Sequence, residues 1–119
     1  MKVSVVDDSK LSRKSVIRVL PEHWTDNISE GVNGREAIEL YEQGKADILF
    51  LDLTMPEMDG FEVLEYLHEQ DAKSIIFVVS ADIQPKAQER VNRLGAAKFL
   101  KKPIDKNLLD EALHEVGLL

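Results

Sequence analysis

Residues 48–60 of the chain read ILFLDLTMPEMDG. The first four residues are apolar without alternation, which is typical of a parallel strand buried on both faces. The strand ends at Asp52, and Pro56 prevents its continuation because proline cannot donate to a strand ladder. Asp59 then begins a helix as its N-cap, and a new apolar period starts at Phe61. This stretch therefore places one carboxylate at the carboxyl end of a buried strand, where open α/β sheets bind their ligands.

The same alternation of strand and helix continues along the whole chain. Strands are predicted at residues 2–6, 26–30, 48–51, 74–80 and 97–102. Helices are predicted at residues 9–20, 33–44, 59–70, 85–95 and 105–116. Ser9 or Asp8 would cap the first helix, and Leu11 and Leu108 belong to the apolar patterns of the first and last helices. The third and fourth strands are the most apolar and belong at the centre of a sheet, whereas the polar second and fifth strands suit its edges. The predicted fold is α/β, a doubly wound (βα)5 protein with a five-stranded parallel sheet in the order 2-1-3-4-5.

The composition is that of one globular domain. A chain of 119 residues, of which 44% are hydrophobic and 31% charged, is large enough for a single core, so residues 1–119 are expected to form one domain. The absence of cysteine excludes disulfides and thiolate metal sites, and no apolar run approaches the roughly 18 residues needed to span a membrane. A cytoplasmic location is therefore expected. The formal net charge of −7 argues against a nucleic-acid-binding surface.

Three acids converge at one edge of the predicted sheet. Strands 1 and 3 are neighbours in the predicted order, and their carboxyl ends carry Asp7, Asp8 and Asp52. Clustered carboxylates repel one another unless a cation balances their charge. Because all the ligands are oxygens, Mg²⁺ is the metal that suits such a site, and it leaves room for water and for a phosphoryl oxygen.

Two further polar side chains reach the same edge. Strand 4 ends in Ser80, and strand 5 ends in Lys102. An aspartate carboxylate can attack phosphorus and form an acyl phosphate. The hydroxyl of Ser80 and the ammonium of Lys102 could then stabilise the transferred group as a hydrogen-bond donor and a point charge.

Four short motifs carry a resemblance to a known family. They are Asp7-Asp8, Asp52 within LDLTMPEMDG, Ser80-Ala81 and Lys102-Pro103. With these motifs at this spacing, the chain resembles the CheY-like receiver domain of bacterial response regulators, which belong to two-component signalling systems. The resemblance covers essentially the whole chain and implies the flavodoxin-like, CheY-like fold.

The resemblance also implies roles for the acids of the site. Asp52 would be the phosphoacceptor. Asp8 and Asp52 would ligate Mg²⁺ directly and Asp7 mainly through water, while the backbone carbonyl of Thr54 would complete the set of ligands. Thr54 and Asp82 would occupy the two variable positions that, in the family, influence the lifetime of the phosphorylated state.

Other residues would carry the response to phosphorylation. By the same resemblance, Ser80 and Lys102 would bind the phosphoryl oxygens, and Ser80 would form a conformational switch together with Phe99. The Lys102–Pro103 peptide bond is a candidate for the cis conformation.

The function implied by the resemblance is signal transduction. A histidine kinase or a histidine phosphotransfer protein would donate the phosphoryl group, and the domain would catalyse only its own phosphotransfer and autodephosphorylation. The phosphorylated state would bind a downstream effector or a dimer mate through the fourth helix, fifth strand and fifth helix, including Lys98, Phe99 and Lys101. No direct contact with nucleic acid or membrane is expected. The sequence leaves open whether the chain acts alone or is the front of a longer regulator.

Three alternative functions fit the sequence less well. A degenerate receiver that serves only as a protein-interaction module is disfavoured because every chemical position of the site is filled. A phosphohydrolase with an aspartyl nucleophile usually has a second acid two residues after it, where this chain has Thr54. A flavodoxin-like cofactor binder would need a glycine-rich phosphate loop after the first strand, but residues 8–12 read DSKLS.

Overall fold

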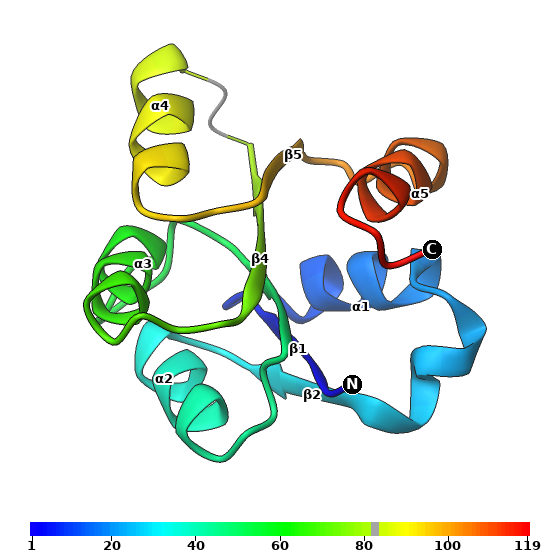
Figure 1. Ribbon diagram of the computed structural model, residues 1–119, viewed down its shortest axis with the longest axis horizontal. Helices are drawn as coiled ribbons and strands as arrows, with labels where there is room; N and C mark the ends of the chain where they lie inside the picture. The colour runs from blue at the N-terminus through cyan, green and yellow to red at the C-terminus, as the bar shows by residue number, and fades with distance from the viewer. Residues whose placement is uncertain (82–83) are drawn as a thin grey trace.

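The structure is a computed structural model that describes residues 1–81 and 84–119, in which strands and helices alternate (Figure 1). The strands are β1 (Val3–Val6), β2 (Ile28–Gly31), β3 (Ile48–Leu51), β4 (Ile75–Ser80) and β5 (Lys98–Lys101). The helices are α1 (Lys10–Val19), α2 (Gly34–Glu42), α3 (Gly60–Glu69), α4 (Pro85–Arg93) and α5 (Lys106–Glu115). A 3-10 helix, η1 (Glu22–Asn27), connects α1 to β2.

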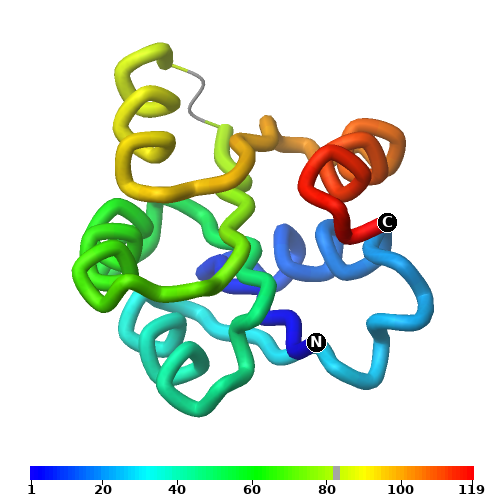
Figure 2. Tube along the Cα trace, viewed as in Figure 1, coloured from blue at the N-terminus to red at the C-terminus, as the bar shows by residue number. Residues whose placement is uncertain are grey.

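The sheet confirms the predicted topology. Its strands lie in the order β2-β1-β3-β4-β5, and every neighbouring pair is parallel. Helices α1 and α5 cover one face, and α2, α3 and α4 cover the other (Figure 1). Figure 2 shows that α1 and α5, at opposite ends of the chain, lie on the same side of the molecule. The order of the strands reverses between β1 and β3, so the switch point of the sheet lies between these two strands.

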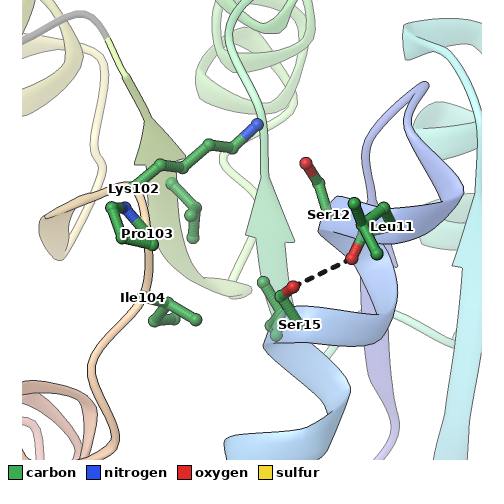
Figure 3. Close-up of a pocket in the computed structure, with 8 residues that line it drawn as sticks. Leu11, Ser12, Ser15, Lys102, Pro103 and Ile104 are labelled. Carbon is green, nitrogen blue, oxygen red and sulfur yellow. Dashed lines mark hydrogen bonds between the residues drawn. The ribbon is translucent and has the colours of Figure 1, made fainter.

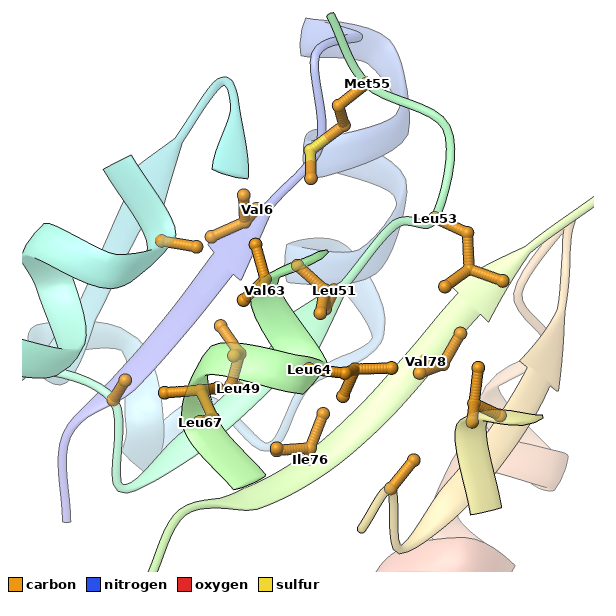
Figure 4. Close-up of a cluster of buried hydrophobic side chains, with 14 of the residues drawn as sticks. Val6, Leu49, Leu51, Leu53, Met55, Val63, Leu64, Leu67, Ile76 and Val78 are labelled. Carbon is orange, nitrogen blue, oxygen red and sulfur yellow. The ribbon is translucent and has the colours of Figure 1, made fainter. Parts of the chain in front are cut away.

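The core consists of two layers, one on each face of the sheet. In β3, Leu49 and Leu51 pack towards α2, α3 and α4, whereas Ile48 and Phe50 pack towards α1 and α5. Figure 4 shows the first layer, in which Leu64 of α3 lies among the side chains of the central strands. Because both faces of β3 are covered, all four of its residues are buried, and this is why the sequence shows an apolar run without alternation.

Four helices begin at the residues that the sequence predicts. The side chains of Ser9, Asn33, Asp59 and Asp105 each accept a hydrogen bond from a backbone N–H in the first turn of the helix that follows. Such an N-cap stabilises a helix by about 1 kcal/mol. Helix α4 instead begins with Pro85 in its first turn, as predicted.

The structure corrects three details of the sequence-based prediction. Residues 26 and 27, predicted to start the second strand, belong to η1, so β2 begins only at Ile28. Leu11 and Leu108, which contribute to the apolar patterns of α1 and α5, are 74% and 58% exposed. Both leucines therefore lie on the outer side of their helices, away from the sheet.

Within the described residues, none of the helices combines the length and the apolar character that a membrane crossing requires.

Candidate functional site

The acids at the switch point lie close together. The register pairs Val6 of β1 with Leu51 of β3, so the next residues, Asp7 and Asp52, leave the sheet side by side. Both are buried, at 4% and 6% exposure, while Asp8 is exposed. One carboxylate oxygen from each of the three residues lies within 4.8 Å of the others. The structure therefore brings together the three acids that the sequence predicts.

Backbone contacts hold this cluster in place. The Asp52 N–H donates to the carbonyl of Val6 at 3.0 Å, and the Asp7 N–H donates to the carbonyl of Gly31 at 3.1 Å. Helix α3 starts very close to the end of β3, since a Cβ atom on Gly60 would lie 2.3 Å from the Asp52 carbonyl oxygen. A glycine is thus required there, because the backbone at the start of α3 packs directly against the end of β3.

Lys102 provides a positive charge within the cluster. Its ammonium nitrogen lies 2.7 Å from Asp7 Oδ2 and 3.2 Å from Asp52 Oδ1. The backbone N–H of Lys102 also donates to the backbone carbonyl of Ser80 at 3.0 Å, which joins the end of β5 to the end of β4. The Lys102–Pro103 peptide bond is cis, as predicted. Lys101, by contrast, is exposed and, by the alternation of a strand, lies on the opposite face of β5 from Lys102.

The pKa values of Asp52 and Lys102 reflect this crowding. Burial and the negative charge of Asp7 raise the pKa of the Asp52 carboxyl above 3.8, although Lys102 and the Leu53 N–H partly offset the shift. Burial acts to lower the pKa of Lys102, but its hydrogen bond to Asp7 and the charges of Asp52 and Asp7 raise it above 10.5. The ammonium therefore stays charged, and the site keeps an excess of negative charge.

This excess charge fits a divalent cation. Three carboxylates against one ammonium give a formal charge of −2 when all three acids are ionised. The ligand atoms are all oxygens, and the exposed Asp8 leaves one side of the cluster open to solvent. Oxygen donors in an open site are what Mg²⁺ requires, because this ion usually keeps several of its waters.

Ser80 ends β4, and Phe99 lies within the neighbouring strand β5. Ser80 is 2% exposed at the last position of β4 and is paired with Lys101 of β5. Phe99 lies opposite Val78 and is partly buried against the core layer that includes α4. Thr54 is exposed, two residues after Asp52 in the β3–α3 loop. The phosphate-binding, switch and metal-ligand roles of these residues stay predictions, and Asp82 lies outside the described residues.

A groove of about 260 Å³ lies beside the cluster, between α1 and the β5–α5 loop. Figure 3 shows Lys102, Pro103 and Ile104 on one side of it and Leu11, Ser12 and Ser15 on the other. The lining includes Lys102 but none of the three acids, so the groove is adjacent to the acidic site rather than part of it.

Comparison with known proteins identifies the family. A model of the response regulator receiver domain matches residues 3–114. The chain belongs to the response regulator receiver family. It is 33% identical to the chemotaxis protein CheY of Thermotoga maritima, over 98% of this chain and 97% of that protein. It is 36% identical to the protein-glutamate methylesterase/protein-glutamine glutaminase of Archaeoglobus fulgidus, over 87% of this chain but only 30% of that longer protein.

Solved structures show the same receiver fold. A CheX–CheY–BeF3–Mg²⁺ complex from Borrelia burgdorferi matches with a TM-score of 0.85 and 26% identity, over 98% of this chain and 88% of that one. The sequence-based prediction of the family and of the CheY-like fold is therefore confirmed. Arg13, which contacts the backbone of Asp7, was not among the predicted site residues. Its position six residues after Asp7 gives no signal by itself, because Lys10 and Lys14 surround it in the same helix.

Proposed function

We propose that this receiver domain accepts a phosphoryl group on Asp52 in a Mg²⁺-dependent reaction and changes conformation in response. The observation that carries the proposal is the cluster of Asp7, Asp8 and Asp52 around the Lys102 ammonium, at the switch point of a chain of the receiver family. The donor would be a phosphohistidine of a histidine kinase or of a phosphotransfer protein. A cytoplasmic location stays a prediction.

The transfer uses the Asp52 carboxylate as a nucleophile. One of its oxygens forms a bond to phosphorus while the bond from phosphorus to the imidazole nitrogen of the donor breaks, and that nitrogen keeps the electron pair. Lys102, 3.2 Å from Asp52 Oδ1, is placed to offset the charge of the phosphoryl oxygens. We propose that the hydroxyl of Ser80 donates a hydrogen bond to one of these oxygens.

The metal site follows from the same residues. Asp7, Asp8, Asp52 and the backbone carbonyl of Thr54 would hold Mg²⁺, which would supply further positive charge opposite the phosphoryl oxygens. The similar CheY from Borrelia burgdorferi, solved with BeF3 and Mg²⁺, supports this assignment.

The domain is proposed to act only on its own phosphoryl group. In autodephosphorylation, a water oxygen attacks phosphorus, the bond to Asp52 breaks with its electron pair returning to the carboxylate, and inorganic phosphate leaves. Turnover of outside substrates is disfavoured because Thr54 stands where an aspartyl phosphohydrolase usually carries its general acid. The product that matters is thus a conformational state rather than a released compound.

The output surface is proposed to be formed by α4, β5 and α5. Phe99 packs on the α4 side of β5, and strand alternation places the exposed Lys101 on that same side. Lys98 forms an ion pair with Glu115 of α5 on the other side. A downstream effector or a second copy of the domain would bind there. The CheX–CheY complex and the longer archaeal methylesterase show that relatives of this chain occur together with other proteins or domains.

Phosphorylation by a small donor tests the proposal. Incubation of the chain with acetyl phosphate and Mg²⁺ should add one phosphoryl group, detected by mass spectrometry of the intact protein. The label should be absent without Mg²⁺ and absent from Asp52→Asn. The matched control is Asp47→Asn, which changes an exposed acid just before the other end of β3. Labelling of Asp52→Asn at the wild-type level would assign the chemistry to another residue.

A further inference from the structure

Arg13 contacts the backbone of the acidic cluster formed by Asp7, Asp8 and Asp52. From α1, its Nη1 donates to the main-chain carbonyl of Asp7 at 2.8 Å, and its Nε donates to Glu30 Oε1 of β2, also at 2.8 Å. The Arg13 side chain is 12% exposed, against 47% for Glu30. A guanidinium presents its donors in a fixed fork, so both contacts together determine its orientation. Arg13 is therefore held in one position by β2 while it holds Asp7.

The backbone of Asp7 is fixed on both sides. Its N–H donates to the carbonyl of Gly31, the residue after Glu30, at 3.1 Å, and its carbonyl accepts the hydrogen bond from Arg13. A peptide unit is planar, so a fixed Asp7 carbonyl also fixes the nitrogen and Cα of Asp8. Both peptide planes that meet at Asp7 are thus attached to β2, one directly and one through Arg13.

This attachment matters most for Asp8. Asp8 is exposed, and within the described part of the chain its carboxylate makes no hydrogen bond. Asp7 differs, because its carboxylate accepts bonds from the Ser9 N–H at 2.9 Å and from Lys102 at 2.7 Å. The direction of the Asp8 carboxylate towards the cluster therefore depends on the orientation of its backbone. Two contacts restrain that backbone, the Arg13 bond to the Asp7 carbonyl on one side of Asp8 and the Ser9 N–H bond to the Asp7 carboxylate on the other.

We infer that Arg13, oriented by Glu30, is a positioning residue for the cation site, acting through the peptide unit between Asp7 and Asp8. The inference rests on the proposed Mg²⁺-dependent function. Residues that orient metal ligands typically affect metal affinity by tenfold or more. Because Arg13 touches the backbone rather than a carboxylate, we expect an effect of about tenfold, at the lower end of that range.

Charge and position make opposite predictions for Arg13. If only its charge mattered, the guanidinium would repel a cation, and removing it would strengthen Mg²⁺ binding to the three carboxylates. If it positions Asp8, its removal should weaken binding despite the loss of this repulsion. The sign of the change in affinity therefore separates the two effects.

Calorimetric titration with Mg²⁺ tests the inference on three chains, the wild type, Arg13→Met and Arg13→Lys. Both variants should bind Mg²⁺ about tenfold more weakly than the wild type. Arg13→Lys keeps the charge and the aliphatic stem but lacks the planar fork that reaches Asp7 and Glu30 together. If Arg13→Met does not fold, Arg13→Lys carries the test alone.

The matched controls are Arg90→Met and Arg90→Lys. Arg90 pairs with Glu65 at 2.8 Å between α4 and α3, so it is also an arginine–glutamate pair that joins two elements, and none of the acids of the cluster is its partner. Mg²⁺ affinity should be unchanged in both controls. Thermal unfolding without Mg²⁺ gives a second readout, since a purely structural role of Arg13 would lower the unfolding temperature and leave the affinity unchanged.

Three results would overturn the inference. Tighter Mg²⁺ binding by Arg13→Met would show that charge dominates. Wild-type affinity in Arg13→Lys would show that the fork between Asp7 and Glu30 is not needed, and wild-type affinity in both variants would leave Arg13 only a structural role. Absence of Mg²⁺ binding by the wild-type chain is a different result, because it overturns the proposed function itself and this inference with it.

Discussion

At the scale of single residues, Asp52 carries its charge where the surroundings disfavour it. Asp52 is 6% exposed, and its carboxylate lies close to that of Asp7. Burial and the repulsion by the negative charge of Asp7 raise the pKa of the Asp52 carboxyl above 3.8. The folded state therefore binds the Asp52 proton more tightly than the unfolded chain does. This contribution to stability is fully present below pH 3.8 and is lost as the pH rises through the folded-state pKa.

Asp52→Asn should consequently be more stable than the wild type at pH 7 in the absence of Mg²⁺. The neutral amide has a similar shape and removes the repulsion, while Lys102 keeps its contact with Asp7 at 2.7 Å. Urea denaturation from pH 7 down to pH 4 should show the advantage shrinking as the pH falls towards 3.8. The exposed control Asp26→Asn should show no such gain. An advantage that grows towards low pH would contradict this account of the charge.

At the scale of elements, the junction between β3 and α3 leaves no room for a side chain at Gly60. A Cβ atom on Gly60 would lie 2.3 Å from the Asp52 carbonyl oxygen and 2.8 Å from the Leu53 Cα. Both neighbours are backbone atoms, so no side chain can move aside to relieve the overlap. The Gly60 N–H also donates to the Leu53 carbonyl at 2.9 Å, which holds the loop between them closed.

Gly60→Ala should therefore destabilise the domain by about 1–3 kcal/mol, the usual range for overpacking, and it should also weaken Mg²⁺ binding because Asp52 must shift. Urea denaturation gives the change in unfolding free energy, and calorimetry gives the affinity. Glu62→Ala, an exposed substitution in the same turn, is the control and should change neither quantity strongly. Stability within about 0.5 kcal/mol of the wild type would mean that the β3–α3 junction can open without cost.

The elements also show how far the sequence could predict the structure. The buried strand β3 and the caps Asp59 and Asn33 are local signals, and the structure confirms them. The start of β2 is set differently, because η1 extends to residue 27 after Pro21 and Trp24 packs against the core there. That tertiary contact produces no periodic pattern of apolar residues, so the sequence alone does not predict where β2 starts.

The site was partly predictable for the same reason. Asp7, Asp52 and Lys102 could be predicted because each lies at the end of a strand, and the strand order then determines which residues meet. The contact of Arg13 with the Asp7 carbonyl depends on the rotamer of a long side chain and on its pairing with Glu30. No spacing in the sequence encodes such a contact.

At the scale of the whole molecule, the proposed function requires the acidic site to affect a distant face. A phosphoryl group on Asp52 would bring acceptor oxygens close to Ser80, which ends β4 beside β5. A movement of the Ser80 side chain would change the packing next to Phe99, which is only partly buried and contacts the core layer that includes Val91 of α4. A close-packed interior favours a change between two discrete arrangements over a gradual deformation.

The shift between two such states has an energetic limit. Changing a ratio of 1:99 into 99:1 requires about 5.5 kcal/mol of differential binding. We therefore expect the active arrangement to be populated to a small extent before phosphorylation, and phosphorylation to raise its population. The surface that responds would be α4, β5 and α5, with Phe99 and, by strand alternation, Lys101 on one side of β5 and Lys98 paired with Glu115 on the other.

The beryllofluoride adduct of the wild-type chain, with Mg²⁺, provides a stable mimic of the acyl phosphate for testing this coupling by NMR. Amide shifts should extend from Asp52 through Ser80 to Phe99 and into α4 and α5. Phe99→Ala should still form the adduct at Asp52, because Phe99 lies outside the acidic cluster. In this variant, the amide shifts caused by the adduct should extend from Asp52 only as far as Ser80 and should not reach α4 and α5. Leu108→Ala, which truncates an exposed side chain of α5, is the control and should keep the full pattern. Wild-type shifts confined to the acidic cluster would contradict the coupling, since β5 and α4 would then receive no signal from Asp52.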